Sequence, residues 1–120
     1  MTNTPTPHLP IAFSACGVAA QIKKNGLPDV ALVVSDRDCV AAALFTTNKV
    51  KAAPVLHDQS LLASDSNHLR AVVINSGCAN ACTGTQGMTD CVNTAQAVAQ
   101  ALSSQHHNPA PIDASQVFVM

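Results

Sequence analysis

The sequence has no tryptophan and no tyrosine, and only three phenylalanines among its 120 residues. Aromatic side chains bury the largest apolar areas and provide the platforms on which single-stranded nucleic acids stack. Hydrophobic residues still make up 48% of the chain, mostly as alanine and valine. We therefore expect a folded core that gains little apolar burial per residue, and marginal stability for this chain alone.

Charge of either sign is also scarce, since six basic and seven acidic residues give a net charge of −1. No basic stripe follows a phosphate backbone, and no apolar run is long enough to span a bilayer. We expect no nucleic-acid or membrane partner. Phe13-Ser14-Ala15-Cys16 loosely imitates a lipoprotein cleavage box. However, the preceding residues contain three prolines, no Lys or Arg, and no proper apolar segment.

Without an export signal, the odd count of five cysteines favours reduced thiols in the cytoplasm. Free cysteine behaves as a small hydrophobe, so we expect all five side chains to be buried. Residues 1–10, rich in threonine and proline, are expected to form a disordered tail, and residues 11–120 the folded domain.

Apolar runs punctuated by polar turns predict the strands. Ile11 to Lys23 reads as a first strand that ends at a turn containing Asn25-Gly26. Val30 to Val34 reads as a buried strand. The run from Cys39 to Thr47 would form a hairpin with it through a tight polar connection at 36–38. Arg70 to Ile74 gives the strongest strand signal.

Two helices are predicted, one from Pro54 to about Ser64 and a second that ends near Ser104. The second begins at Met88 with Thr85 or Thr89 as its cap. Its apolar side chains recur with a period of 3.6 residues, at Cys91, Val92, Ala95, Val98, Ala99 and Leu102. A last strand begins at Gln116 and the sequence stops within it, so we interpret the chain as incomplete at its C-terminus.

The segment Asn75 to Gly84 carries the chemical signal. It joins a predicted strand to a predicted helix and reads Asn-Ser-Gly-Cys-Ala-Asn-Ala-Cys-Thr-Gly. Such a loop presents backbone N–H groups and the positive end of the helix dipole toward one point, where an anion or a developing oxyanion is stabilised. Neither a phosphate-binding nor a dinucleotide-binding motif is present. A loop of small residues that only packs the helix on the sheet is the alternative.

This segment resembles the signature Asn-Ser-Gly-Asn-Ala-Asn-Ala-Cys-Thr-Gly of the ornithine acetyltransferase (glutamate N-acetyltransferase) family. The block Phe45 to Val55 resembles a second family block, and Gly17 to Gly26 and Leu32 to Asp36 resemble the family's first two strands. The resemblance runs in order from about Ile11 to Met120. It implies an α/β fold, a DmpA/ArgJ-like layered sandwich of mixed or antiparallel sheet and helices, present here incompletely as the N-terminal part of the alpha chain.

The resemblance also implies an activity. Family members transfer an acetyl group from N-acetylornithine to glutamate in arginine biosynthesis, and some accept acetyl-CoA as donor. The precursor cleaves itself, a threonine becomes the nucleophile, and two alpha and two beta chains assemble into a heterotetramer. Thr83 and Gly84 occupy the family's oxyanion-hole positions. The nucleophile lies beyond this chain, and neither cofactor nor metal is implied.

One residue departs from the family pattern, because Cys78 stands where the family has asparagine. A thiol cannot reproduce the hydrogen bonds of an amide, so we expect the loop to be braced differently.

Other functions remain alternatives. The chain as an isolated piece is a candidate for a catalytically inactive structural fragment. Cys78, Cys82 and Cys91 with His106 or His107 suggest a metal-binding module, although the spacing is not that of a zinc finger or ribbon. Cys78 or Cys82 with His57 or His68 suggests a Cys-dependent hydrolase. Solvated side chains are the simpler expectation for both histidines and for Asp36, Asp38 and Asp58.

Overall fold

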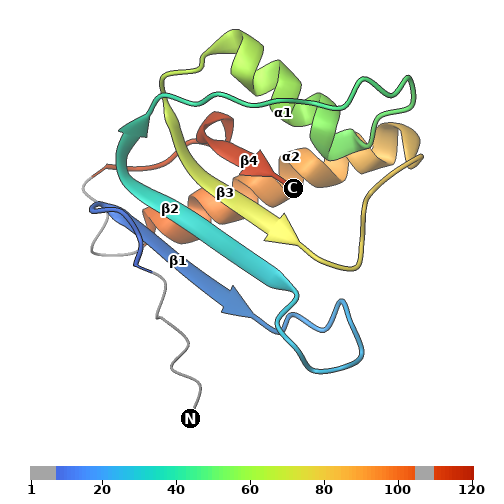
Figure 1. The fold of residues 1–120 in the computed structure, drawn as a ribbon, viewed down its shortest axis with the longest axis horizontal. Helices are drawn as coiled ribbons and strands as arrows, with labels where there is room; N and C mark the ends of the chain where they lie inside the picture. The colour runs from blue at the N-terminus through green and yellow to red at the C-terminus, as the bar shows by residue number, and fades with distance from the viewer. Residues whose placement is uncertain (1–7, 105–109) are drawn as a thin grey trace.

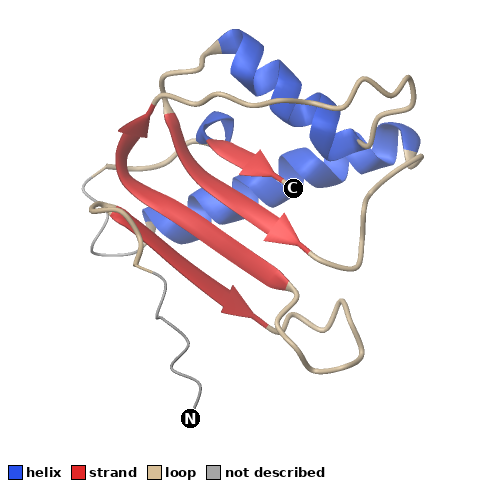
Figure 2. Ribbon diagram, in the orientation of Figure 1, coloured by secondary structure: helices blue, strands red, loops and turns tan. Residues whose placement is uncertain are grey.

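The computed structural model describes residues 8–104 and 110–120. They form a four-stranded sheet in the order β1-β2-β3-β4 with two α-helices (Figures 1 and 2). Residues 1–7 of the predicted tail lie outside the described part, and residues 8–10 are exposed and precede the first strand. In chain order the elements are β1 Phe13–Val18, β2 Val30–Cys39, α1 Ala53–Ser64, β3 Leu69–Asn75, α2 Gly84–Ser103, the 3-10 helix η1 Ala114–Gln116, and β4 Val117–Val119.

The sheet is mixed, which confirms the predicted α/β class. β2 pairs antiparallel with both β1 and β3, opposing Val18 to Val30 and Val72 to Val33. β4 instead pairs parallel with β3, because the chain crosses over through α2 between these two strands (Figure 1). As a result, the carboxyl ends of β3 and β4 lie side by side at the same end of the sheet.

α2 covers one face of the sheet and forms the core with it. The predicted apolar face of this helix is confirmed at four positions, because Cys91, Ala95, Ala99 and Leu102 are buried. It is wrong at Val92, which is exposed. The small side chains let the helix approach the strands closely. These helix residues pack against alternate residues of β3 and β4, whose side chains point to the same face: Ala71, Val73, Val117 and Val119.

The predicted hairpin between Val30–Val34 and Cys39–Thr47 is wrong. β2 continues through the polar residues to Cys39, and its hairpin partner is β1. The pairing of β2 with β3 is irregular between Val34 and Cys39. This irregularity places the charged residues 36–38 at the end of the sheet, where Asp38 meets polar groups of β3. Residues 40–52 run to α1 without forming a helix or strand.

The first strand is shorter than predicted because a buried carboxylate ends it. Asp29, only 3% exposed, accepts hydrogen bonds from the backbone N–H groups of Ala20 at 2.6 Å and Lys23 at 2.8 Å. These bonds, of which that from Lys23 has the largest effect, hold the pKa of Asp29 below its usual value. The chain after Val18 therefore folds around Asp29 and does not extend the strand.

α1 spans its predicted residues, but the expected stripe of apolar side chains is only partly correct. Leu56 is 45% exposed, whereas His57 and Asp58 are buried at 7% and 2%. Both were expected to be solvated. Burial is tolerated because His57 Nδ1 lies 2.8 Å from Asp58 Oδ1, which also accepts the N–H of Val119 at 3.0 Å.

The cysteines also differ from expectation. Cys91 is the one buried thiol of the five, Cys39 is half-buried, and the others are exposed: Cys16, Cys78 and Cys82. Exposure follows from position, because Cys16 lies on an edge strand and the other two lie in the loop after β3.

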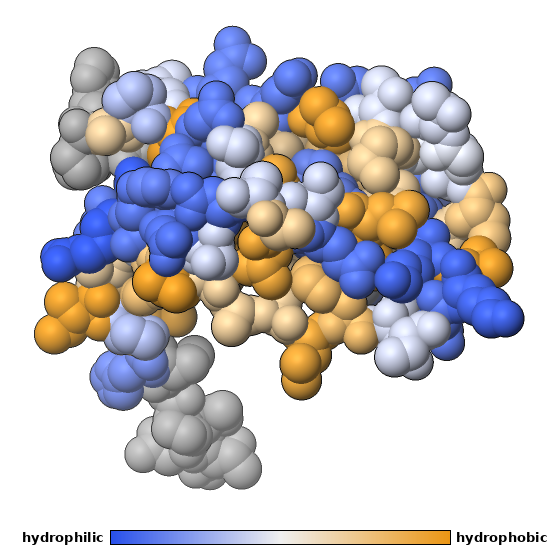
Figure 3. Space-filling view, turned by 90° about the horizontal axis from the view of Figure 1, so that it is seen from above, coloured by the Kyte–Doolittle hydropathy of each residue, from blue (hydrophilic) through white to orange (hydrophobic). Residues whose placement is uncertain are grey.

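Apolar side chains also reach the surface. Seen from above, they form several patches between polar groups (Figure 3). Leu44 and Ile11 are almost fully exposed, and Val40 and Val50 are 79% and 72% exposed. Neither described helix is long and apolar enough to cross a membrane.

Candidate active site

The loop from Asn75 to Gly84 lies where β3 and β4 end and α2 begins. Asn75 ties the two strand ends together, because its backbone N–H donates to Met120 O at 2.8 Å and its Nδ2 donates to the same oxygen at 3.3 Å. In sheets with helical crossovers, the carboxyl ends of parallel strands are the usual place for ligands. The signature segment therefore occupies a favourable position.

The loop is held by side chains and by unusual backbone conformations. Asn75 Oδ1 accepts the N–H of Cys78 at 3.3 Å, so the departure from the family signature leaves a backbone contact in place while the Cys78 side chain stays exposed. Asn80, Cys82 and Gly84 all have positive φ angles, of 48°, 59° and 61°. Left-handed conformations of non-glycine residues cost free energy and concentrate at functional sites.

Thr83 is the N-cap residue of α2, so the predicted caps Thr85 and Thr89 are wrong. The Thr83 hydroxyl does not cap the helix in the usual way. It donates instead to Asn80 Oδ1 at 2.6 Å. Because the hydroxyl makes no capping hydrogen bond, the first helical N–H groups lack the partner that an N-cap side chain normally provides.

Gly84 follows with a φ of +61°, which favours glycine. A Cβ atom placed on it would meet no atom of the described residues within 4 Å. Glycine is thus required here by backbone conformation and not by packing. The space beside its backbone is open to an approaching group.

A cavity of about 370 Å³ adjoins the loop. Thr83 and Asn80 line it together with Cys78 and the α2 residues Asp90 and Cys91; Gly84 is not among its lining residues. A second cavity, of about 660 Å³, lies between the loop, α1 and residues 43–45. The two adjoin at the end of β4, because both are lined by Pro54, Asn75, Cys78, Val119 and Met120.

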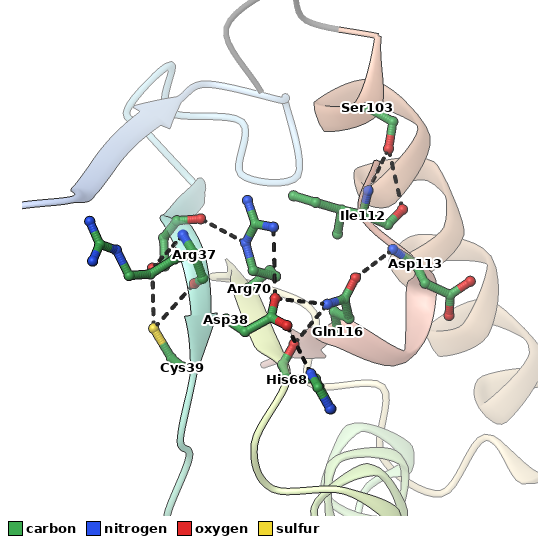
Figure 4. Close-up of polar contacts among 10 residues, drawn as sticks. Arg37, Asp38, Cys39, His68, Arg70, Ser103, Ile112, Asp113 and Gln116 are labelled. Carbon is green, nitrogen blue, oxygen red and sulfur yellow. Dashed lines mark hydrogen bonds and ion pairs between the residues drawn. The ribbon is translucent and has the colours of Figure 1, made fainter. Parts of the chain in front are cut away.

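The histidines do not join the loop. His68 precedes β3 and Cys78 follows it, which places them at opposite ends of that strand. Figure 4 shows His68 beside Asp38, with Nδ1 at 2.8 Å from Oδ2; its Nε2 also lies 3.2 Å from Asp65. The hydrogen bond that Asp38 accepts from the His68 ring is the largest cause of the raised pKa of His68, and the negative charges of Asp65 and Asp38 raise it further.

His57 faces a different cavity, between α1 and α2 beside Met88 and Ala114. The structure therefore gives no support to a thiol–histidine pair. Among residues 8–104 and 110–120, no cluster of three metal-ligating side chains is present. His106 and His107 lie outside the described residues.

The contacts of Asn80 and Gly87 beside Thr83 were not predicted from the sequence. Asn80 contacts Thr83, and Gly87 in the first turn of α2 leaves room for both side chains. The signal that could have revealed Gly87 is its position, because glycine inside a helix is unfavourable and suggests a close approach.

Comparison with known proteins identifies relatives. The sequence model of the ArgJ family matches residues 14–117. The arginine biosynthesis bifunctional protein ArgJ of Mycobacterium leprae is 55% identical over 95 residues, which cover 78% of this chain and 23% of that protein. The chain thus spans about a quarter of the length of the curated relatives it matches.

Two solved structures share the fold. The crystal structure of ornithine acetyltransferase from Mycobacterium tuberculosis, complexed with ornithine, superimposes with a TM-score of 0.84 and 50% identity, covering 92% of this chain and 55% of that one. The ArgJ protein of Bacillus halodurans gives a TM-score of 0.77 and 34% identity, covering 92% and 52%.

Proposed function

Because this chain belongs to the ArgJ family, we propose that it supplies the oxyanion site of an acetyltransferase in arginine biosynthesis. The reaction is transfer of an acetyl group from N-acetylornithine to glutamate, with acetyl-CoA as an alternative donor. Thr83 and Gly84 are the proposed oxyanion-hole residues. The chain would act with a beta chain from the same precursor, in an assembly of two alpha and two beta chains.

The observation that carries this proposal is the conformation at the start of α2. Thr83 turns its hydroxyl to Asn80, so its side chain leaves the first helical N–H groups uncapped, and Gly84 leaves open space beside the backbone. N–H groups fixed at the positive end of a 20-residue helix stabilise negative charge without rearranging.

The chemistry follows from this arrangement. A threonine hydroxyl of the beta chain attacks the acetyl carbonyl of N-acetylornithine. The carbonyl oxygen becomes negatively charged in the tetrahedral intermediate, next to Gly84 and Thr83. The carbon–nitrogen bond then breaks, and the departing ornithine amine takes up the proton lost by the hydroxyl. In the second half-reaction the glutamate amine attacks the acetyl ester and restores the hydroxyl.

Most of the length of the relatives has no counterpart in this chain, so we propose that the chain alone does not turn over. The experiment compares it with a chimaera in which residues 14–117 replace the matching region of the Mycobacterium tuberculosis relative. The chimaera should form N-acetylglutamate from N-acetylornithine and glutamate, and the purified chain should not. A folded chimaera without transfer, beside an active parent enzyme, would contradict the proposal.

A further inference from the structure

The side-chain amide of Asn80 has a defined orientation. Its Nδ2 donates to Gly87 O at 2.8 Å and to Cys91 Sγ at 3.3 Å. Both partners accept hydrogen bonds, so the nitrogen must face α2 and Oδ1 must face away from it. Oδ1 lies 2.6 Å from Thr83 Oγ1, and since it can only accept, the hydroxyl proton belongs to this bond.

The far end of this network is anchored in the core. Cys91 is only 1% exposed and belongs to the core cluster between α2 and the sheet. Burial raises the pKa of the Cys91 thiol, which therefore stays neutral. Asn80 thus connects the exposed Thr83 side chain to a rigid part of the molecule, across the first two turns of α2.

Gly87 makes this arrangement possible. A Cβ atom on Gly87 would lie 1.8 Å from Thr83 Oγ1 and 2.4 Å from Asn80 Oδ1, distances at which atoms collide. The Asn80 amide and the Thr83 hydroxyl therefore meet directly over the helix backbone. A side chain at position 87 would therefore have to displace the Thr83 hydroxyl and the Asn80 amide from their present places.

The Thr83 hydroxyl carries one proton, which Asn80 and a bound oxyanion cannot both receive. We propose that Asn80 is a positioning residue of the oxyanion site. It holds Thr83 Oγ1 over the first turn of α2, and the hydroxyl rotates its proton from Asn80 to the substrate oxygen as negative charge develops there. This inference rests on the proposed function.

The test is a double-mutant cycle in the active chimaera. Asn80→Gly removes the side chain while its backbone keeps the positive φ without strain. We expect kcat to fall roughly 10- to 100-fold, as misplaced catalytic groups do, with KM unchanged. In a Thr83→Ala background the same substitution should cause no further loss of kcat, because Asn80 acts through Thr83.

Asn80→Asp is a second kinetic test of the Asn80 contacts, because it changes the hydrogen-bonding groups and keeps the shape of the side chain. It loses the donors to Gly87 and Cys91, and its carboxylate binds the Thr83 proton more strongly than an amide oxygen does. Its kcat should fall at least as far as that of Asn80→Gly. Asn93→Ala is the matched control, because Asn93 is exposed on α2 and should leave kcat unchanged.

The outcomes separate the two claims. A folded but inactive unmutated chimaera defeats the proposed function. In an active chimaera, unchanged kcat in Asn80→Gly, or an equal loss with and without Thr83, overturns the inference. A readout independent of activity uses this chain itself. Thr83→Val should shift the NMR signals of the Asn80 side-chain amide and speed its hydrogen exchange, and unaltered signals would equally overturn the inference.

Discussion

Asp58 Oδ1 accepts a hydrogen bond from the backbone N–H of Val119 at 3.0 Å, joining α1 to β4 across 61 positions of sequence. β4 pairs with β3 on its other side, so this carboxylate satisfies an N–H on the outer edge of the sheet. His57 Nδ1 lies 2.8 Å from the same oxygen. A buried carboxylate with two partners thus covers this N–H of β4, which is an outer strand of the sheet among the described residues.

Removal of this carboxylate should destabilise the chain. Asp58→Ala leaves a buried N–H without an acceptor, which costs about 1–3 kcal/mol of the free energy of unfolding. Urea unfolding followed by circular dichroism measures the loss. Asp36→Ala is the matched control, because Asp36 is exposed on β2. Equal stability of the two variants would show that the contact with Val119 contributes nothing.

The two glycines that flank the start of α2 should respond differently to alanine. Gly84→Ala incurs the cost of a left-handed conformation, about 1–2 kcal/mol, and its methyl group fills the open space where the substrate oxygen is proposed to bind, so it should lower kcat directly. Gly87→Ala forces Thr83 and Asn80 apart, so in the active chimaera it should also reduce kcat. Thermal melts and kinetics of both variants check this. Full kcat in folded Gly87→Ala would mean that the contact is dispensable.

Stability should depend on the protonation of His68. Its pKa is raised in the folded protein, so its contribution is fully present below the unfolded value of 6.5 and is lost as pH rises through the folded pKa. The effect should be small because the side chain is 58% exposed. Melting temperatures between pH 5 and 8 should fall less in His68→Gln than in the unmutated chain, and identical profiles would contradict the assignment.

Exposed apolar side chains should make the chain prone to self-association. Leu44, Val40 and Val50 stand in a segment without secondary structure, and β1 presents a sheet edge with no strand partner among the described residues. We expect a hydrophobic dye to bind and the chain to self-associate with rising concentration. Leu44→Ser should weaken dye binding. A sharply melting monomer that binds no dye would count against this expectation.

The elements that could be predicted from the sequence are those in which the local pattern of apolar residues matches the burial of those residues in the fold. α2 and β3 were found because apolar periodicity and β-branched residues directly reflect burial. The hairpin after β2 was mispredicted, since Asp38 looks like a turn residue when its partners His68 and Arg70 are unknown. The burial of Asp58 also depends on a strand 61 positions away.

The candidate site was located by its signature and not by its physics. The order of residues identified Thr83 and Gly84 as oxyanion-hole positions, but only the structure shows where the hydroxyl points. The contact of Asn80 with Gly87 and Cys91 arises from the left-handed turn of the loop, which residue composition does not encode.

The most direct test of the account is the turnover of Thr83→Ala in the chimaera. A hydroxyl that contacts charge present only in the tetrahedral state should lower kcat and kcat/KM together and leave KM unchanged. One such donor is typically worth about 100- to 1,000-fold in kcat, or roughly 3–4 kcal/mol. Thr83→Ser should retain much more activity. Thr89→Ala, which removes an exposed hydroxyl bonded within α2, should match the unmutated protein. Equal kcat in folded Thr83→Ala and the unmutated chimaera would contradict the oxyanion assignment.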